Sequence, residues 1–192
     1  ELCANDMYDI IKRDIAGQYY LDNYPNEGQR FVAWYLRNIH NLEPFETPEC
    51  VTDGANDKQV DAIVFDHDIQ TVYIIQCKFK NGVIDAKPLG EILTSLIYIN
   101  NLNKFHDYAN TKLKNWIKEL GDAVEANYDF VFQFVTTAAL TESAKHAAQL
   151  YQERFREEDT INASLEVIDR NMLQSKYDES IDKPKPYINY EF

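Results

Sequence analysis

The sequence predicts an α/β fold in which helices flank a central mixed β-sheet. Two runs rich in Val, Ile, Phe and Tyr, residues 60–66 and 71–79, are separated by only four residues, which is typical of an antiparallel hairpin. Two later strand-like runs, 130–137 and 165–168, are separated by a helix-length segment, which favours a crossover between strands. With 192 residues, 45% of them hydrophobic, the chain is long enough for one domain with a sizeable core.

Helical periodicity precedes the hairpin. We expect two helices in the first forty residues, joined by the turn-prone segment 18–26. In the second helix four residues recur at a spacing of four and form one stripe: Glu27, Phe31, Tyr35 and Ile39.

Helical periodicity returns after the hairpin, at about residues 89–103, 104–125 and 141–158, the last capped by Thr141. We expect residues 1–182 to form the single domain. Residues 183–192, which open with Lys-Pro-Lys-Pro, then begin a linker or the next domain of a longer protein.

The chain is acidic, with a formal net charge of -13, which opposes non-specific attraction to nucleic acid phosphates or anionic membranes. Residues 41–70 alone hold eight acidic residues against Lys58, a local charge of -7. This segment either binds cations or is a solvated loop.

The sequence lacks the motifs of disulfide-rich, zinc-binding, membrane-spanning, serine hydrolase and P-loop proteins. The three cysteines lie far apart and form neither a disulfide framework nor a zinc motif, so a reducing cytoplasmic setting is expected. No run of eighteen apolar residues occurs, and no membrane partner is expected. The four histidines lack metal-ligand spacing, and neither a nucleophile elbow nor a phosphate-binding glycine loop is present.

The hairpin carries the strongest chemical pattern. With the four-residue loop, Asp66 faces Thr71 and opposed positions sum to 137, which pairs Asp61 with Gln76. Lys78 follows two residues later and shares that face, whereas Cys77 points to the other face and leaves its carbonyl near the group.

A carboxylate, an amide oxygen and a backbone carbonyl are hard oxygen ligands suited to Mg²⁺. The ligand set expected from this pattern is Asp61, Gln76 and the Cys77 carbonyl, with Glu27 as a further carboxylate if its helix packs on the sheet. A lysine beside such an ion orients or deprotonates a water, or neutralises charge developing on a phosphate. Metal-assisted phosphodiester hydrolysis fits this pattern.

Residues 52–63 and 74–78 read TDGANDKQVDAI and IIQCK. These segments resemble the core of PD-(D/E)XK nucleases, in the variant with glutamine at the third acidic position. More narrowly, they resemble the N-terminal domain of abortive-infection phage-resistance (AIPR) proteins and the catalytic domain of Mrr-type restriction enzymes.

The resemblance implies a restriction-endonuclease-like core and an endonuclease that cleaves nucleic acid with Mg²⁺ or Mn²⁺ in bacterial phage defence. It implies that Asp61 binds the metal, that Gln76 is the variant acidic position and that Lys78 is the catalytic lysine, while the family's helix glutamate falls on Glu27 by position. The expected partners are nucleic acid, above all DNA with RNA as the alternative, a C-terminal domain of the same chain, and a second copy in a homodimer.

Other interpretations stay open. Asp53 and Asp57 are expected to be turn formers around Gly54 rather than ligands. Because Gln76 is neutral and the preceding loop is poor in glycine, a catalytically inactive relative that binds nucleic acid or a protein is the first alternative. The second is an interaction domain whose acidic loop, with Glu43, Glu46 and Glu49, meets a basic protein surface.

Candidate phosphate contacts are the lysines beyond the hairpin, whose second group is equally well explained as a solvated helix face. They are Lys78, Lys80 and Lys87, and then Lys104, Lys112, Lys114 and Lys118.

Overall fold

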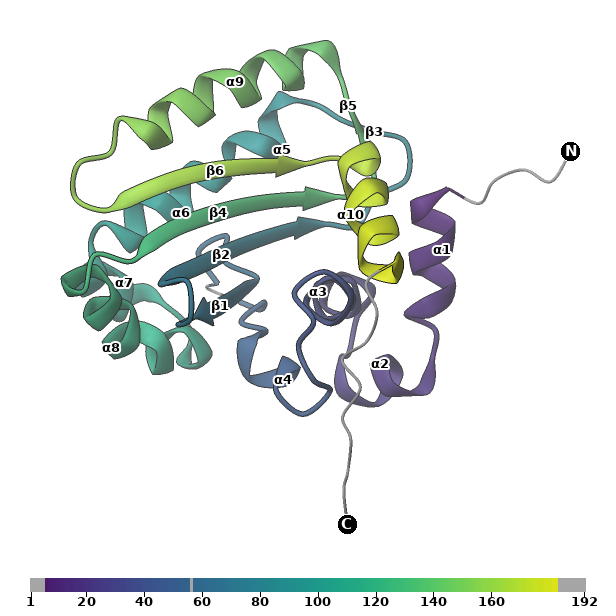
Figure 1. The fold of residues 1–192 in the computed structure, drawn as a ribbon, viewed down its shortest axis with the longest axis horizontal. Helices are drawn as coiled ribbons and strands as arrows, with labels where there is room; N and C mark the ends of the chain where they lie inside the picture. The colour runs from purple at the N-terminus through teal and green to yellow at the C-terminus, as the bar shows by residue number, and fades with distance from the viewer. Residues whose placement is uncertain (1–5, 56, 183–192) are drawn as a thin grey trace, which may run out of the picture.

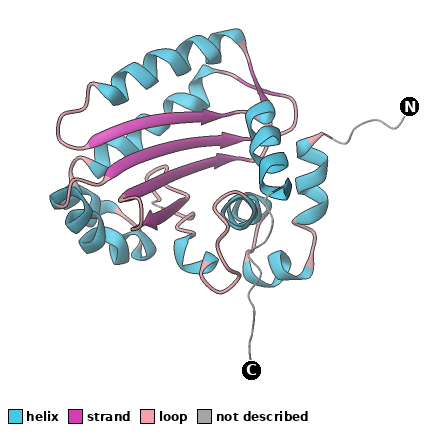
Figure 2. Cartoon of the chain, viewed as in Figure 1, coloured by secondary structure: helices cyan, strands magenta, loops and turns pink. Residues whose placement is uncertain are grey.

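The structure is a computed structural model that describes residues 6–55 and 57–182 (Figure 1). The central sheet has the strand order β1-β2-β4-β6, formed by β1 (Ala62–Asp66), β2 (Thr71–Lys78), β4 (Asp129–Thr136) and β6 (Asn162–Ile168). β1 runs antiparallel to β2, whereas β2, β4 and β6 run parallel to one another. The predicted α/β fold with a mixed central sheet is therefore confirmed (Figure 2).

Helices cover both faces of the sheet (Figure 1). One face carries a core that includes side chains of α1 (Met7–Asp14), α3 (Glu27–Asn38) and α10 (Arg170–Asp182). The opposite core includes residues of α5 (Ala86–Gly90), α6 (Ile92–Ile99), α7 (Leu102–Tyr108), α8 (Thr111–Glu125) and α9 (Glu142–Arg156). The remaining short helices are α2 (Gln18–Asn23) and α4 (Thr47–Cys50).

Alternation along the strands assigns side chains to the two cores. In β4, Phe130, Phe132 and Phe134 enter one core, while Val135 enters the other. The stripe predicted on α3 packs against the sheet as expected, because Phe31 and Tyr35 are fully buried and the Tyr35 hydroxyl donates to Gln133 Oε1 of β4 at 2.9 Å.

The hairpin has the predicted register. Asp66 pairs with Thr71 and Ala62 with Ile75, so opposed positions sum to 137. β2 then continues as an inner strand, with Gln76 beside Phe134 and Lys78 beside Thr136 of β4. The register fixes which face of the sheet each candidate site residue occupies.

Several helix boundaries differ from prediction. The segment expected as a turn between the first two helices contains α2, and the two long helices predicted across residues 89–125 are four helices. Asn101 and Asn110 explain two of the breaks, because their side chains cap α7 and α8 by accepting from Lys104 N and Leu113 N. A single residue, Glu91, separates α5 from α6.

Four elements had no counterpart in the prediction, one of them α4 in the acidic segment before the hairpin. β3 (Val83–Ile84) and β5 (Ala139–Leu140) form a short parallel pair beside the main sheet. α10 has only Leu173 fully buried, so its apolar stripe is too sparse to be recognised from periodicity.

Residues 183–192, expected to begin a linker, lie outside the described residues. Among the helices of the described part, none combines the length and apolar character required to cross a membrane.

Candidate metal centre

Asp61 lies just before β1, one residue beyond the regular ladder. Its backbone N–H donates to the Ile75 carbonyl at 2.8 Å, and its Oδ2 accepts a hydrogen bond from the Cys77 amide at 2.7 Å. The predicted pairing of Asp61 with Gln76 is thus replaced by a contact between the Asp61 carboxylate and the backbone that follows Gln76. The carboxylate is held against the end of β2.

Gln76 is almost completely buried, with 1% of its surface exposed. Its Nε2 donates to Gln59 Oε1 at 2.8 Å, while its Oε1 is buried with no hydrogen-bond partner among the described residues. An unsatisfied buried oxygen costs about 1–3 kcal/mol, so this atom calls for a donor or a cation. Gln76 therefore offers one free oxygen next to the residue whose amide binds Asp61.

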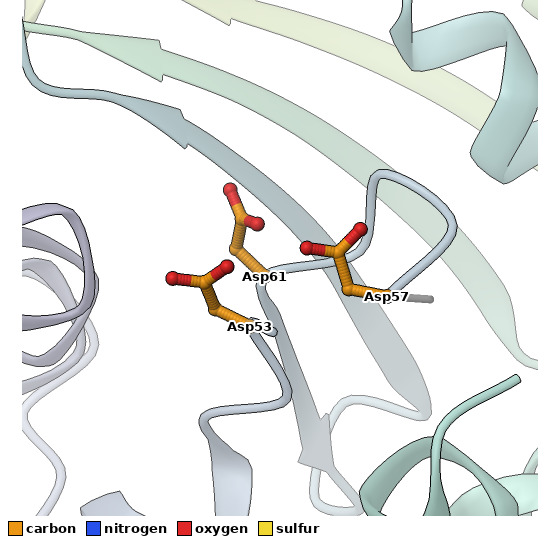
Figure 3. A group of neighbouring side chains, drawn as sticks. All are labelled: Asp53, Asp57 and Asp61. Atoms are coloured by element: carbon orange, nitrogen blue, oxygen red, sulfur yellow. The ribbon is translucent and has the colours of Figure 1, made fainter. Parts of the chain in front are cut away.

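Asp53 and Asp57 lie beside Asp61 (Figure 3). One carboxylate oxygen from each of the three aspartates lies within 4.8 Å of the others, and all three side chains are partly buried. Asp57 is a turn former as predicted, because it accepts from the amides of Gly54 and Gln59. It also brings its carboxylate to Asp61, which the sequence interpretation did not anticipate.

The loop that carries these aspartates closes on itself through the backbone. The amides of Thr52 and Asp53 both donate to the Asp61 carbonyl, at 2.8 and 3.1 Å. Lys58 and Gln59 adopt positive φ angles of 56° and 64°, a region that side chains with Cβ atoms seldom occupy. This closure turns the chain back so that the start and the end of the loop meet.

Two helices anchor the loop from outside. Gln29 of α3 donates through Nε2 to the Asp53 carbonyl at 3.2 Å, and Asn110, the N-cap of α8, donates through Nδ2 to the Thr52 carbonyl at 3.0 Å. The aspartates therefore lie in a loop bound to both helical layers.

Burial and mutual repulsion perturb the carboxylates. The pKa of Asp61 is raised from 3.8 to about 7, chiefly by burial and also by the charges of Asp53 and Asp57, while the Cys77 amide and Lys78 act in the opposite direction. Burial and the adjacent Asp57 also raise the pKa of Asp53, with the Lys112 charge acting in the opposite direction. Crowded acids of this kind are stabilised by bound cations or protons.

Lys78 ends β2, and its Nζ lies 2.9 Å from Oε2 of Glu91. Both side chains line an open cleft of about 540 Å³ between the end of β2, the start of α3 and the α5–α6 junction. Cys77, whose amide binds Asp61, also lines this cleft, so the Asp61 carboxylate contacts the strand end that forms part of its wall.

Glu27 is the first residue of α3 and lines the same cleft, with Gly28 beside it. The helix begins there because the Asn26 side chain caps it by accepting from Gln29 N. The structure thus brings Glu27 to the cleft that holds Lys78, while its role as a ligand remains a prediction.

Of the other residues singled out from the sequence, some lie near the cleft and others lie away from it. Cys77 packs against the core opposite to that of Ile74, as the strand alternation predicted. Of the candidate phosphate-contact lysines, Lys80 lines the cleft and Lys118 pairs with Asp122 on the exposed surface. Lys112 acts electrostatically on Asp53, which indicates that the start of α8 lies near the aspartates.

The arrangement offers four oxygen-bearing side chains and one cation. Three carboxylates, the free Gln76 oxygen and the Lys78 ammonium come from one loop and one strand end, a composition suited to a hard divalent cation beside a polyanion. Comparison of the chain with protein-family models, curated proteins and solved structures gives no match.

Proposed function

We propose that this domain is a Mg²⁺-dependent nuclease of the PD-(D/E)XK type, related to the N-terminal domain of AIPR proteins, that cleaves DNA in phage defence. The observation that carries the proposal is the convergence of Asp53, Asp57 and Asp61, with Asp61 bound to the amide of Cys77, which lines the cleft of Lys78. The buried Gln76 oxygen, which has no partner among the described residues, precedes Cys77 in the chain. A restriction-endonuclease-like core is part of the proposal, supported by the order of helices and strands.

The residues present fit a divalent cation. Asp61, Asp53 and Asp57 would hold it with their carboxylates, and Gln76 with the amide oxygen that has no partner within residues 6–55 and 57–182. The Cys77 carbonyl and Glu27 are the further ligands inferred from sequence. When bound, Mg²⁺ polarises the phosphate and favours ionisation of a water.

The protein's own groups supply the rest of the reaction. In hydrolysis a water oxygen bonds to phosphorus and one P–O ester bond breaks, while the water loses a proton and the leaving oxygen gains one. Lys78, from the cleft wall, either takes that proton or neutralises charge on the phosphate oxygens. Lys80 and Glu27 line the same cleft, where Lys80 is a phosphate contact.

The acidity of the chain is compatible with this function. Of the net charge of -13, -7 lies in residues 41–70, which include all three aspartates. A bound divalent cation offsets part of that field at the site itself. Further affinity for the polyanion is assigned to a C-terminal domain or to a second copy of the chain.

The direct test is cleavage of plasmid DNA and of single-stranded RNA with Mg²⁺ or Mn²⁺, using the wild type, Asp61→Asn and Lys78→Met. Matched controls are Asp122→Asn on α8 and Lys145→Met on α9, each of which removes one partner of an exposed ion pair away from the site. We expect metal-dependent cleavage by the wild type and both controls, and loss of at least about a hundredfold in the site variants. Equal cleavage by all five proteins contradicts the site assignment.

A catalytically inactive relative remains the second candidate, favoured by one observation: Gln76 brings no negative charge to the ligand set. This alternative predicts that the wild type binds nucleic acid or a protein without cleaving it. Metal binding by calorimetry combined with intact DNA and RNA would support it over the nuclease.

A further inference from the structure

Glu91 is a cleft residue to which the motif assigns no role. It stands between α5 and α6 and ends one helix while beginning the next. Its Oε2 lies 2.9 Å from Lys78 Nζ, and both residues line the cleft together with Glu27. The lysine proposed as catalytic therefore already has an anionic partner inside the cleft.

The backbone that presents Glu91 is rigidly held. Leu89 and Ile92 on either side are completely buried, and the Glu91 amide donates to the Pro88 carbonyl. A Cβ on Gly90 would come within 3.0 Å of the Tyr151 hydroxyl, which shows how closely α5 packs on α9. Glu91 thus projects its carboxylate from a fixed point rather than from a mobile loop.

Stability does not account for this pair. The side chains of Lys78 and Glu91 are 34% and 39% exposed, and ion pairs as accessible as this contribute little to folding. Other ion pairs of the molecule, such as Lys145 with Glu142 on α9, lie on the outer surface, whereas this one lines the cleft.

We propose that Glu91 is a positioning residue that holds the end of the Lys78 side chain in the cleft, directed at the phosphate. The ion pair fixes the end of a long, flexible side chain that would otherwise occupy several rotamers. The assignment rests on the proposed nuclease function and decides between the two roles left to Lys78. The attacking water loses its proton to solvent, and the positioned Lys78 side chain stabilises the negative charge on the phosphate oxygens.

The kinetic test compares Glu91→Gln, Lys78→Arg and Lys78→Met with the wild type, in cleavage of labelled DNA with Mn²⁺. Glu142→Gln is the matched control, because it removes the carboxylate of a Lys–Glu pair with the same 2.9 Å separation. We expect Glu91→Gln to lower kcat by roughly 10–100-fold, with KM and the calorimetric affinity for Mn²⁺ unchanged. Glu142→Gln keeps the wild-type rate.

Lys78→Arg separates a charged role from a basic one. Arginine cannot lose its proton in a protein, so it can replace a charge donor but not a base. We expect Lys78→Arg to retain at least about a tenth of the activity, against a loss of roughly 10²–10³ in Lys78→Met. Equal loss in both variants overturns the charged role.

A spectroscopic test does not depend on turnover. In the metal-free wild type, the ¹⁵N ammonium resonance of Lys78 is expected to be observable, because the ion pair slows proton exchange, and to be lost in Glu91→Gln. A wild-type rate or a reduced Mn²⁺ affinity in Glu91→Gln overturns the positioning role and leaves the nuclease assignment standing. Absence of metal-dependent cleavage in the wild type overturns the nuclease assignment, and the role of Glu91 with it.

Discussion

The Asp61 carboxylate accepts a hydrogen bond from the Cys77 amide at 2.7 Å, which ties the first candidate ligand to the strand that carries Gln76 and Lys78. The bond holds one oxygen of Asp61 against β2. Asp53 and Asp57 lie within 4.8 Å of the same carboxylate, so its charge is opposed by burial and by two neighbouring acids, and favoured by the Cys77 amide and the Lys78 charge. The first two predictions follow from that imbalance.

Asp61 should make the metal-free protein less stable as the pH rises. Its folded-state pKa of about 7 lies above the ordinary 3.8, so the folded protein holds a proton that the unfolded chain releases. The stabilisation is complete below about pH 4 and is lost as the pH passes 7, with an upper limit of roughly 4 kcal/mol. Urea denaturation in EDTA at several pH values measures this, and Asp61→Asn should flatten the curve.

The control for that experiment is Asp122→Asn, an exposed aspartate paired with Lys118 on α8. Its stability curve should run parallel to that of the wild type. Identical pH dependence in the wild type and Asp61→Asn would mean that Asp61 ionises without cost in the folded state, contrary to its crowded surroundings.

A bound divalent cation should offset the repulsion among the three aspartates and stabilise the folded protein. Mn²⁺ at about a hundred times its Kd should raise the free energy of unfolding by about 2.7 kcal/mol, and affinity should be higher at pH 8 than at pH 6 because protons compete for the carboxylates. Calorimetry should give at least about tenfold weaker binding for Asp53→Asn and Asp57→Asn. Unchanged Mn²⁺ binding in both variants would remove these two residues from the ligand set.

The hairpin was predictable because it depends on local pattern. Two β-rich runs and a four-residue loop sufficed for the register, and strand alternation then assigned Cys77 to the face opposite Ile74. The mixed sheet followed from the helix-length separation of the last strands. Membership of a nuclease family, which the resemblance implies, remains a prediction.

The positions of Asp53, Asp57 and Glu91 were not predictable in the same way. The two aspartates reach Asp61 because backbone amides of Thr52 and Asp53 meet the Asp61 carbonyl, and because Lys58 and Gln59 adopt positive φ. The residue types in this loop do not predict that its two ends meet. Glu91 reaches Lys78 because α5 packs on α9, a tertiary contact without a local signal.

The tip of the hairpin gives a prediction on stability alone. Gln70 is exposed and has a φ of 50°, a conformation that costs side chains with a Cβ about 1 kcal/mol and glycine far less. Gln70→Gly should therefore be neutral to stabilising by up to roughly 1 kcal/mol in thermal denaturation. Gln149→Gly, at an exposed interior position of α9, should instead destabilise by about 1 kcal/mol. Equal losses in the two variants would contradict the strain at Gln70.

Gln76→Glu tests the neutral ligand most directly. The substitution replaces a buried amide, 1% exposed, with a fourth carboxylate and removes the hydrogen bond that Nε2 donates to Gln59. Without metal, the added buried charge should cost several kcal/mol, roughly 3 or more, which urea denaturation at pH 8 measures. With Mn²⁺ the extra charge becomes favourable, so calorimetry should show tighter binding and the stability difference from the wild type should shrink. A loss of stability that Mn²⁺ leaves unchanged would mean that the Gln76 oxygen does not face the cation.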